Sequence, residues 1–149
     1  MFNLNRTILV IVNVILPLVL GGLIYISFRS VNLIMFGWFD SIGIHGLIYK
    51  IRELLTPFKR NIPKWIYFSL PDGLWVYSFS SVLILIWRDK LKVAIAWLMI
   101  PFTSGCLVEL AQFIKIFPGT FDVMDLIMTL SGITLSLLIL KHKRIEKKQ

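Results

Sequence analysis

Residues 8–28 read ILVIVNVILPLVLGGLIYISF and carry no charged side chain. A helix needs about 20 mostly apolar residues to cross the hydrocarbon core of a bilayer, so this stretch predicts a membrane-spanning helix. Pro17 and the Gly21-Gly22 pair lie inside it, and membrane helices tolerate such residues because neighbouring groups satisfy the freed backbone. The run is longer than the apolar part of a secretory signal peptide, so we expect the helix to be retained.

Three more apolar segments follow the first, and they cover about residues 70–87, 93–114 and 122–140. The whole chain is 57% hydrophobic and 16% charged, with a mean hydropathy of +0.81. Soluble domains have roughly a quarter of their residues charged. The sequence therefore predicts an all-α membrane protein, with four transmembrane helices in one domain that covers residues 1–149.

The segment of about residues 42–58, between the first two apolar runs, has the pattern of an amphipathic helix. Its apolar residues recur at helical spacing, and they are Ile44, Leu47, Ile48, Ile51, Leu54, Leu55 and Phe58. Trp38, Trp65 and Tyr67 flank it, so we expect a helix in the headgroup region that ends or bends at Pro57. Such a helix would either anchor the loop or cover a cavity.

Basic residues indicate the orientation. Four spans would put Arg6, the loop 88–92 and the basic tail 141–149 on one side, and the opposite short loop 115–121 carries one basic residue. The positive-inside rule then places both termini in the cytoplasm. The net charge of +8 is explained by contact with anionic lipid, so we expect no nucleic-acid partner.

Polar residues at membrane depth mark the candidate site. Glu109 lies inside the third apolar segment, with Gln112 three residues later on the same helix face. A carboxylate at this depth normally faces the bundle interior and has a partner. Asp122 and Asp125 open the fourth segment, and Asp72 opens the second at the same membrane face. We expect these residues to gather at one membrane boundary.

Each acid also has a structural interpretation. Asp122 can cap the fourth helix, with Asp125 complementing the helix dipole. Asp72 can act likewise in the second helix, since Ser69-Leu70-Pro71-Asp72 has the spacing of a capping box. Capping does not explain Glu109, which a hydrogen bond from Gln112 or Ser104 would satisfy.

The residue types limit the chemistry. Two carboxylates in different surroundings can divide acid and base roles, which suits Glu109 and Asp125. Carboxylates with an amide would also suit a hard cation such as Mg²⁺ or Ca²⁺. Cys106 is the one cysteine, and His45 and His142 lie elsewhere in the chain, so we expect no transition-metal site. The cofactor, if there is one, is left open.

The run from residue 108 to 132 resembles the VanZ-like family of small bacterial membrane proteins. Its pattern has E-x-x-Q on one helix, D-x-x-D at the start of the next, and a glycine seven residues later; the matching residues are Glu109, Gln112, Asp122, Asp125 and Gly132. The resemblance covers mainly residues 93–140. Residues 119–121 lack the basic residue that the family usually has ahead of the first aspartate, and Thr129 stands where asparagine is common.

The resemblance implies a bacterial plasma-membrane protein with a role in the cell envelope, and one relative is tied to lowered sensitivity to teicoplanin. One hypothesis is that Glu109 and Asp125 act catalytically at the outer leaflet on a lipid or cell-wall precursor, which Gln112, Asp122 and Asp72 bind. The alternative is a non-enzymatic scaffold or partner-binding protein, in which the acids only cap and pin the last two helices. A transporter is disfavoured because polar residues along the spans are sparse. Whether the chain is an enzyme, and its oligomeric state, are left open.

Overall fold

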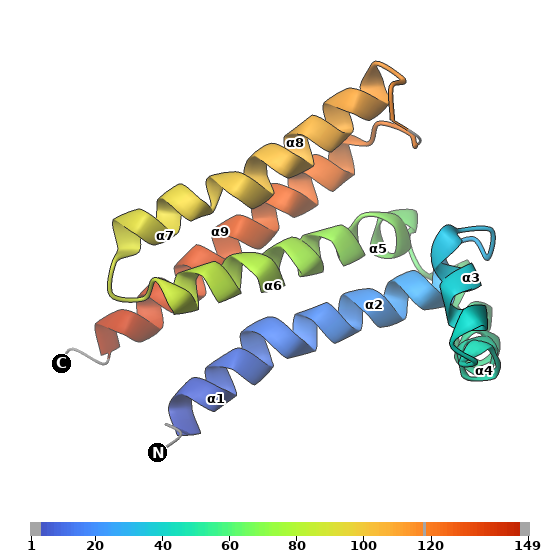
Figure 1. The fold of residues 1–149 in the computed structure, drawn as a ribbon, viewed down its shortest axis with the longest axis horizontal. Helices are drawn as coiled ribbons and strands as arrows, with labels where there is room; N and C mark the ends of the chain where they lie inside the picture. Colours follow the sequence, from blue (N-terminus) through green and yellow to red (C-terminus); the bar gives the residue numbers. More distant parts are fainter. Residues whose placement is uncertain (1–3, 118, 147–149) are drawn as a thin grey trace.

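The computed structural model describes residues 4–117 and 119–146, with side chains over 6–117 and 119–140. Helices make up 82% of the chain, and the described residues contain no strand, which confirms the all-α prediction (Figure 1). Pro118 of the short loop 115–121 and Lys147 and Lys148 of the tail lie outside the described residues.

The first long helix is continuous from residue 4 to residue 28, although it was predicted to start at residue 8. It consists of α1 (Leu4–Val10), one π-helical turn (Ile11–Ile15) and α2 (Leu16–Phe28). Pro17 has no N–H, so the Asn13 carbonyl lacks its usual helical donor and the turn widens, with the Leu16 N–H bonding to Ile11. The Asn13 side chain is buried and donates to the Leu9 carbonyl at 2.8 Å.

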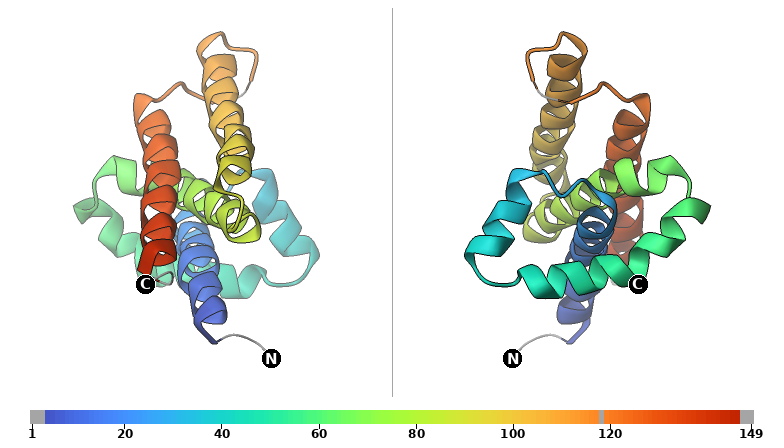
Figure 2. Two further views of the ribbon diagram at one scale, coloured as in Figure 1. Left: turned by 90° about the vertical axis from the view of Figure 1, so that its left-hand side faces the viewer. Right: turned by 90° about the vertical axis from the view of Figure 1, so that its right-hand side faces the viewer.

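Helix α6 (Leu70–Ile86) lies between α2 and α9 (Figures 1 and 2). Polar side chains of α6 reach the first helix: Tyr77 donates to Asn13 Oδ1 at 2.7 Å and Ser78 to the Val14 carbonyl at 2.8 Å. Trp75 Nε1 donates to the Leu18 carbonyl at 3.3 Å. Such bonds between helices join them where surrounding lipid gives no hydrophobic drive to associate.

Helix α9 (Val123–Glu146) crosses α6 at very short range. A Cβ atom on Gly132 would lie 2.6 Å from the Gly73 carbonyl oxygen and 3.0 Å from the Tyr77 nitrogen, so only glycine fits there. The helix continues six residues past Leu140, where the apolar run ends and our predicted span ended. Hydropathy marks where the lipid-compatible part of a helix stops, whereas Lys and Arg are good helix formers that extend it into water.

The segment predicted as one helix over 93–114 forms two, α7 (Leu91–Trp97) and α8 (Met99–Phe113). Pro101 cannot donate to the Trp97 carbonyl, and the helix breaks at Leu98. Leu98 packs with three other buried residues, Ile84, Ala94 and Leu140, in an apolar core at the end of the bundle that holds the α6–α7 turn.

Three helical stretches in the described residues are long and apolar enough to cross a membrane: Arg6–Phe28, Leu91–Phe113 and Val123–Leu140. The apolar α6 is shorter, at 17 residues. Large apolar side chains on the outside of the bundle are exposed, such as Leu18 at 51%, Leu107 at 62% and Leu138 at 60%. These are features of a helical membrane-embedded protein.

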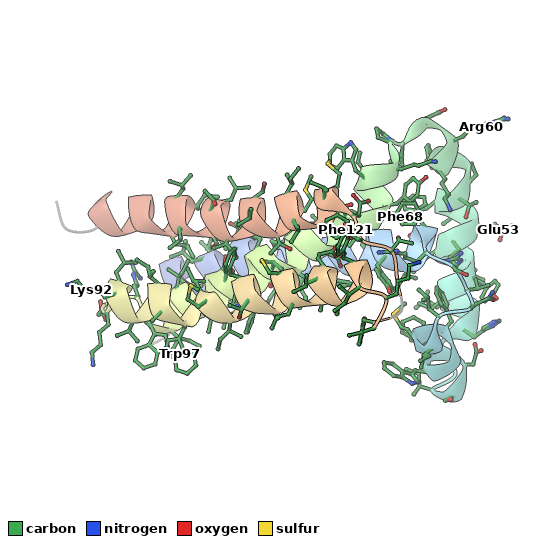
Figure 3. All side chains as sticks on the ribbon, turned by 90° about the horizontal axis from the view of Figure 1, so that it is seen from above. Glu53, Arg60, Phe68, Lys92, Trp97 and Phe121 are labelled. Carbon is green, nitrogen blue, oxygen red and sulfur yellow. The ribbon has the colours of Figure 1, made fainter. Side chains whose placement is uncertain are left out.

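The interfacial segment was predicted as one helix over 42–58. Residues 42–58 contain one α-helix, α4 (His45–Leu55), followed by the start of a 3₁₀ helix (Thr56–Asn61). The division lies outside the predicted range, because a separate helix, α3 (Ile34–Ser41), precedes it and the short α5 (Lys64–Phe68) follows. Gly43 has φ +75°, which separates α3 from α4, and Pro57 lies in the 3₁₀ turn that ends α4. We call residues 34–61 the crosswise segment, because α4 lies across the end of the bundle (Figures 1 and 3).

Two basic side chains attach the crosswise segment to the end of α2. Arg52 donates to the Ile26 carbonyl, and Lys59 Nζ donates to the Phe28 carbonyl at 3.1 Å. Carbonyls in the last turn of a helix have no intrahelical donor and carry partial negative charge, so cations stabilise them. The crosswise segment is therefore fixed to the bundle by the residues that give it its charge.

Candidate functional site

A cavity of about 1270 Å³ lies at the bundle end that carries the crosswise segment, between α2, α5, α6, α8 and α9. All five candidate site residues from the sequence line it, and they are Asp72, Glu109, Gln112, Asp122 and Asp125. Residues far apart in the chain thus meet in one hollow, which we call the end cavity.

Glu109 is held by the start of the next helix. It is 6% exposed, and its Oε2 accepts a hydrogen bond from the Asp122 N–H at 3.0 Å. Neither expected partner is used: the structure shows no Gln112–Glu109 bond, and the Ser104 hydroxyl donates to the Pro101 carbonyl at 3.1 Å. The carboxylate therefore joins α8 to the beginning of α9.

Asp122 caps α9, as the sequence predicted. Its Oδ1 accepts from the Met124 N–H at 2.9 Å, and α9 begins at the next residue, Val123. Asp125 lies in the first turn of α9 and is half-buried. The capping interpretation accounts for the position of Asp122, while Asp125 still faces the end cavity.

Gln112 is covered by the loop that follows α8. Gly119 has φ +135°, and a Cβ atom there would come within 2.8 Å of the Gln112 amide carbon. The Gln112 Oε1 is buried and has no hydrogen-bond partner among the described residues. The α8 end itself has Schellman hydrogen bonds, with Lys115 at φ 60° where glycine is usual.

The capping box expected at α6 does not form. Ser69 has helical dihedrals, φ −104° and ψ −32°, and its hydroxyl makes no capping bond, because α5 leads directly into α6. The first backbone donors already have carbonyl partners, such as Gly73 N–H with Ser69 O at 3.2 Å. The buried Ser69 hydroxyl instead lies beside Asp125, close enough to interact but without hydrogen-bond geometry.

Two basic residues in the end cavity were not predicted as site residues. Arg29, directly after α2, donates from Nη2 to the Phe68 carbonyl at 3.0 Å, and its guanidinium lies over the rings of Tyr25 and Phe68, at 5.1 and 5.0 Å. Lys64, the first residue of α5, also lines the cavity. Neither residue stood out in the sequence, since a basic residue beside an apolar run is ordinary at a membrane boundary.

Arg29 brings a positive charge to the end cavity. It acts electrostatically on Asp72 and Asp125, although none of the cavity's four carboxylates, all within the described part of the chain, forms an ion pair with it. The position of Arg29 in the sequence could have identified it as a site residue. The residue after the first apolar segment must lie at the same bundle end as the acids that begin the second and fourth apolar segments.

The acids do not form an evident metal site. Within residues 4–117 and 119–146, no group of three or more His, Cys, Asp or Glu side chains is placed to hold a metal ion. The end cavity is instead lined by a mixture of acids, cations and aromatic rings.

Comparison of the chain with protein-family models, with curated proteins and with solved structures finds no match. Fold and site together define a class: a helical, membrane-embedded bundle with a charged cavity at one end.

Proposed function

We propose that this chain is a four-span, VanZ-like protein of the bacterial plasma membrane, with both termini cytoplasmic and the end cavity at the outer leaflet. Helix α6 supports the fourth span because it runs alongside α2 and α9, and its 17 residues reach the lower limit for crossing. The two chain ends leave from the bundle end opposite the crosswise segment (Figure 1), and the basic tail favours the cytoplasm there.

The proposed activity is the binding and processing of an envelope lipid or a lipid-linked cell-wall precursor. The observation that carries it is the composition of the end cavity. Charged side chains gather near the ends of the helices, while Val76, Phe79 and Pro101 line the part of the cavity deeper along α6 and α8, together with the small polar Ser104 and Thr129. An amphipathic ligand fits such a hollow, with its headgroup among the charges and its chain along the apolar wall.

Glu109 and Asp125 are the proposed acid–base pair. Glu109 is buried and held by one backbone donor, whereas Asp125 is half-buried near Arg29, and carboxylates in unlike surroundings can take unlike roles. Gln112, Asp122 and Asp72 would bind the headgroup.

A scaffold role has its own support. The Glu109–Asp122 bond and the Asp122 cap are the contacts expected if the acids only pin α8 to α9. In that case the protein would recruit a partner or shield a lipid without chemistry.

The test compares wild type with Glu109→Gln and Asp125→Asn in a host that lacks the native gene, at matched membrane abundance. We expect both variants to accumulate normally and to lose protection against envelope stress and teicoplanin. Glu53→Gln is the control, since Glu53 is exposed and points away from the bundle (Figure 3). Full protection by the two variants, or their disappearance from the membrane, would favour the scaffold.

A further inference from the structure

The charges of the end cavity are separated by element. Arg29 and Lys64 come from the end of α2 and the start of α5, whereas Glu109, Asp122 and Asp125 come from α8, the loop and α9. Glu109 lies within the electrostatic influence of Asp122 and Asp125, whereas Asp72 lies within that of Asp125, Arg29 and Glu109. The end cavity thus has a cationic side and an acidic side, with Asp72 between them.

The cation on one side is fixed in place before any ligand arrives. The Phe68 carbonyl and the rings of Tyr25 and Phe68 hold the Arg29 guanidinium, and none of the described acids neutralises it by direct contact. Trp65 and Trp75 line the cavity nearby. A guanidinium in such a setting is suited to bind a phosphate group.

An anionic ligand alone does not match this cavity. Four carboxylates and two cations line it, so a ligand that also carries a positive group complements the lining better than a purely anionic one. A primary ammonium can donate hydrogen bonds to the Glu109 and Asp125 carboxylates. A quaternary ammonium has no N–H and cannot donate such bonds.

We propose that the end cavity binds a zwitterionic headgroup, a phosphate ester that also carries a primary amine. The phosphate lies against Arg29 and Lys64, and the ammonium against Glu109 and Asp125. This inference rests on the proposed lipid-binding function and names the chemistry of the ligand.

The experiment measures which lipid the purified full-length chain retains. The protein is equilibrated with an equal mixture of phosphatidylethanolamine, phosphatidylglycerol and phosphatidylcholine of one acyl composition, in EDTA so that no divalent cation bridges the acids. Retained lipid is counted by native mass spectrometry. We expect the ethanolamine lipid to exceed each of the others by about tenfold, since charge-assisted hydrogen bonds have that magnitude.

Substitutions test the acidic side and the cationic side of the end cavity separately. Asp125→Asn should reduce the preference for ethanolamine over glycerol lipid, whereas Lys64→Gln, at an exposed position that should not disturb folding, should weaken retention of both. Arg29→Gln should weaken it further. Arg60→Gln is the matched control, because Arg60 points away from the bundle (Figure 3), and it should behave as wild type.

The outcomes distinguish the zwitterionic-headgroup inference from the proposed lipid-binding function on which it rests. Equal retention of the three lipids, or a preference for the glycerol lipid, overturns the zwitterionic site and leaves a lipid-binding cavity. Retention of no lipid overturns both. Displacement of the ethanolamine lipid by soluble glycerophosphoethanolamine would support a soluble ligand with the same headgroup chemistry. Resistance to displacement would support a membrane lipid as the ligand.

Discussion

Glu109 shows what single residues contribute. A carboxylate can accept about four hydrogen bonds, and the described part of the chain supplies one donor, the Asp122 N–H. The sequence singled out Glu109 because a charge inside an apolar run is costly without a purpose. It did not single out Arg29, because a cation at a membrane boundary costs nothing. Its role depends on Tyr25 and Phe68, which only the fold brings to it.

The backbone of Lys115 is strained. With φ 60° it occupies the left-handed region, which costs a residue with a Cβ roughly 1 kcal/mol. Lys115→Gly should therefore raise the free energy of unfolding by about that amount, as measured by thermal unfolding of the purified protein. Lys115→Ala removes the same charge but keeps the strain, so an equal gain in that variant would refute the explanation.

At the scale of elements, the apolar runs predict where helices lie but not where they break. Pro101 was visible inside the third run, yet a proline in a membrane helix is compatible with a continuous span, a kink or a break. Packing around Leu98 decides among these. The amphipathic pattern over 42–58 likewise indicated which residues share a face, and Pro57 lies in the turn that ends α4 as predicted, but the pattern gave no sign of the separate helix α3 before it.

The α6–α9 crossing gives a prediction for an element pair. Gly132→Ala places a methyl group 2.6 Å from the Gly73 carbonyl oxygen, so the helices must separate, at a cost of about 1–3 kcal/mol. The loss should appear in chemical unfolding of the purified protein. Gly22→Ala is the control, because a Cβ at Gly22 meets nothing within 4 Å, and it should cause no loss. Equal effects of the two changes would contradict the close crossing.

At the scale of the whole molecule, the sequence predicted that the acids would share one end, since alternate ends of successive antiparallel spans coincide. It did not predict that the crosswise segment is tied to that end through the last carbonyls of α2. The sequence placed the segment that holds Arg52 in the headgroup region, but Arg52 and the nearby Lys59 both donate to the backbone of α2. Predicting such an attachment requires the three-dimensional positions of the Ile26 and Phe28 carbonyls.

Removing one attachment should loosen the crosswise segment and leave the bundle intact. Arg52→Gln shortens the side chain that reaches the Ile26 carbonyl, so amide hydrogen exchange in α4 should accelerate severalfold while α6 and α9 stay protected. Lys50→Gln, an exposed change on the same helix, should leave exchange unaltered. Uniform acceleration through all helices would show that the segment is part of the bundle's cooperative core.

The chain ends and the end cavity lie at opposite ends of the bundle. Helix α9 begins beside the cavity at Val123 and runs to Glu146, 24 residues or about 36 Å of helix. A protein bound to the C-terminal end of α9 and a molecule bound in the cavity would therefore not come into contact. Any communication between them would have to pass along α9 as a rigid-body movement of the helix. The close contact of Gly132 with Gly73 is the point about which α9 would rotate.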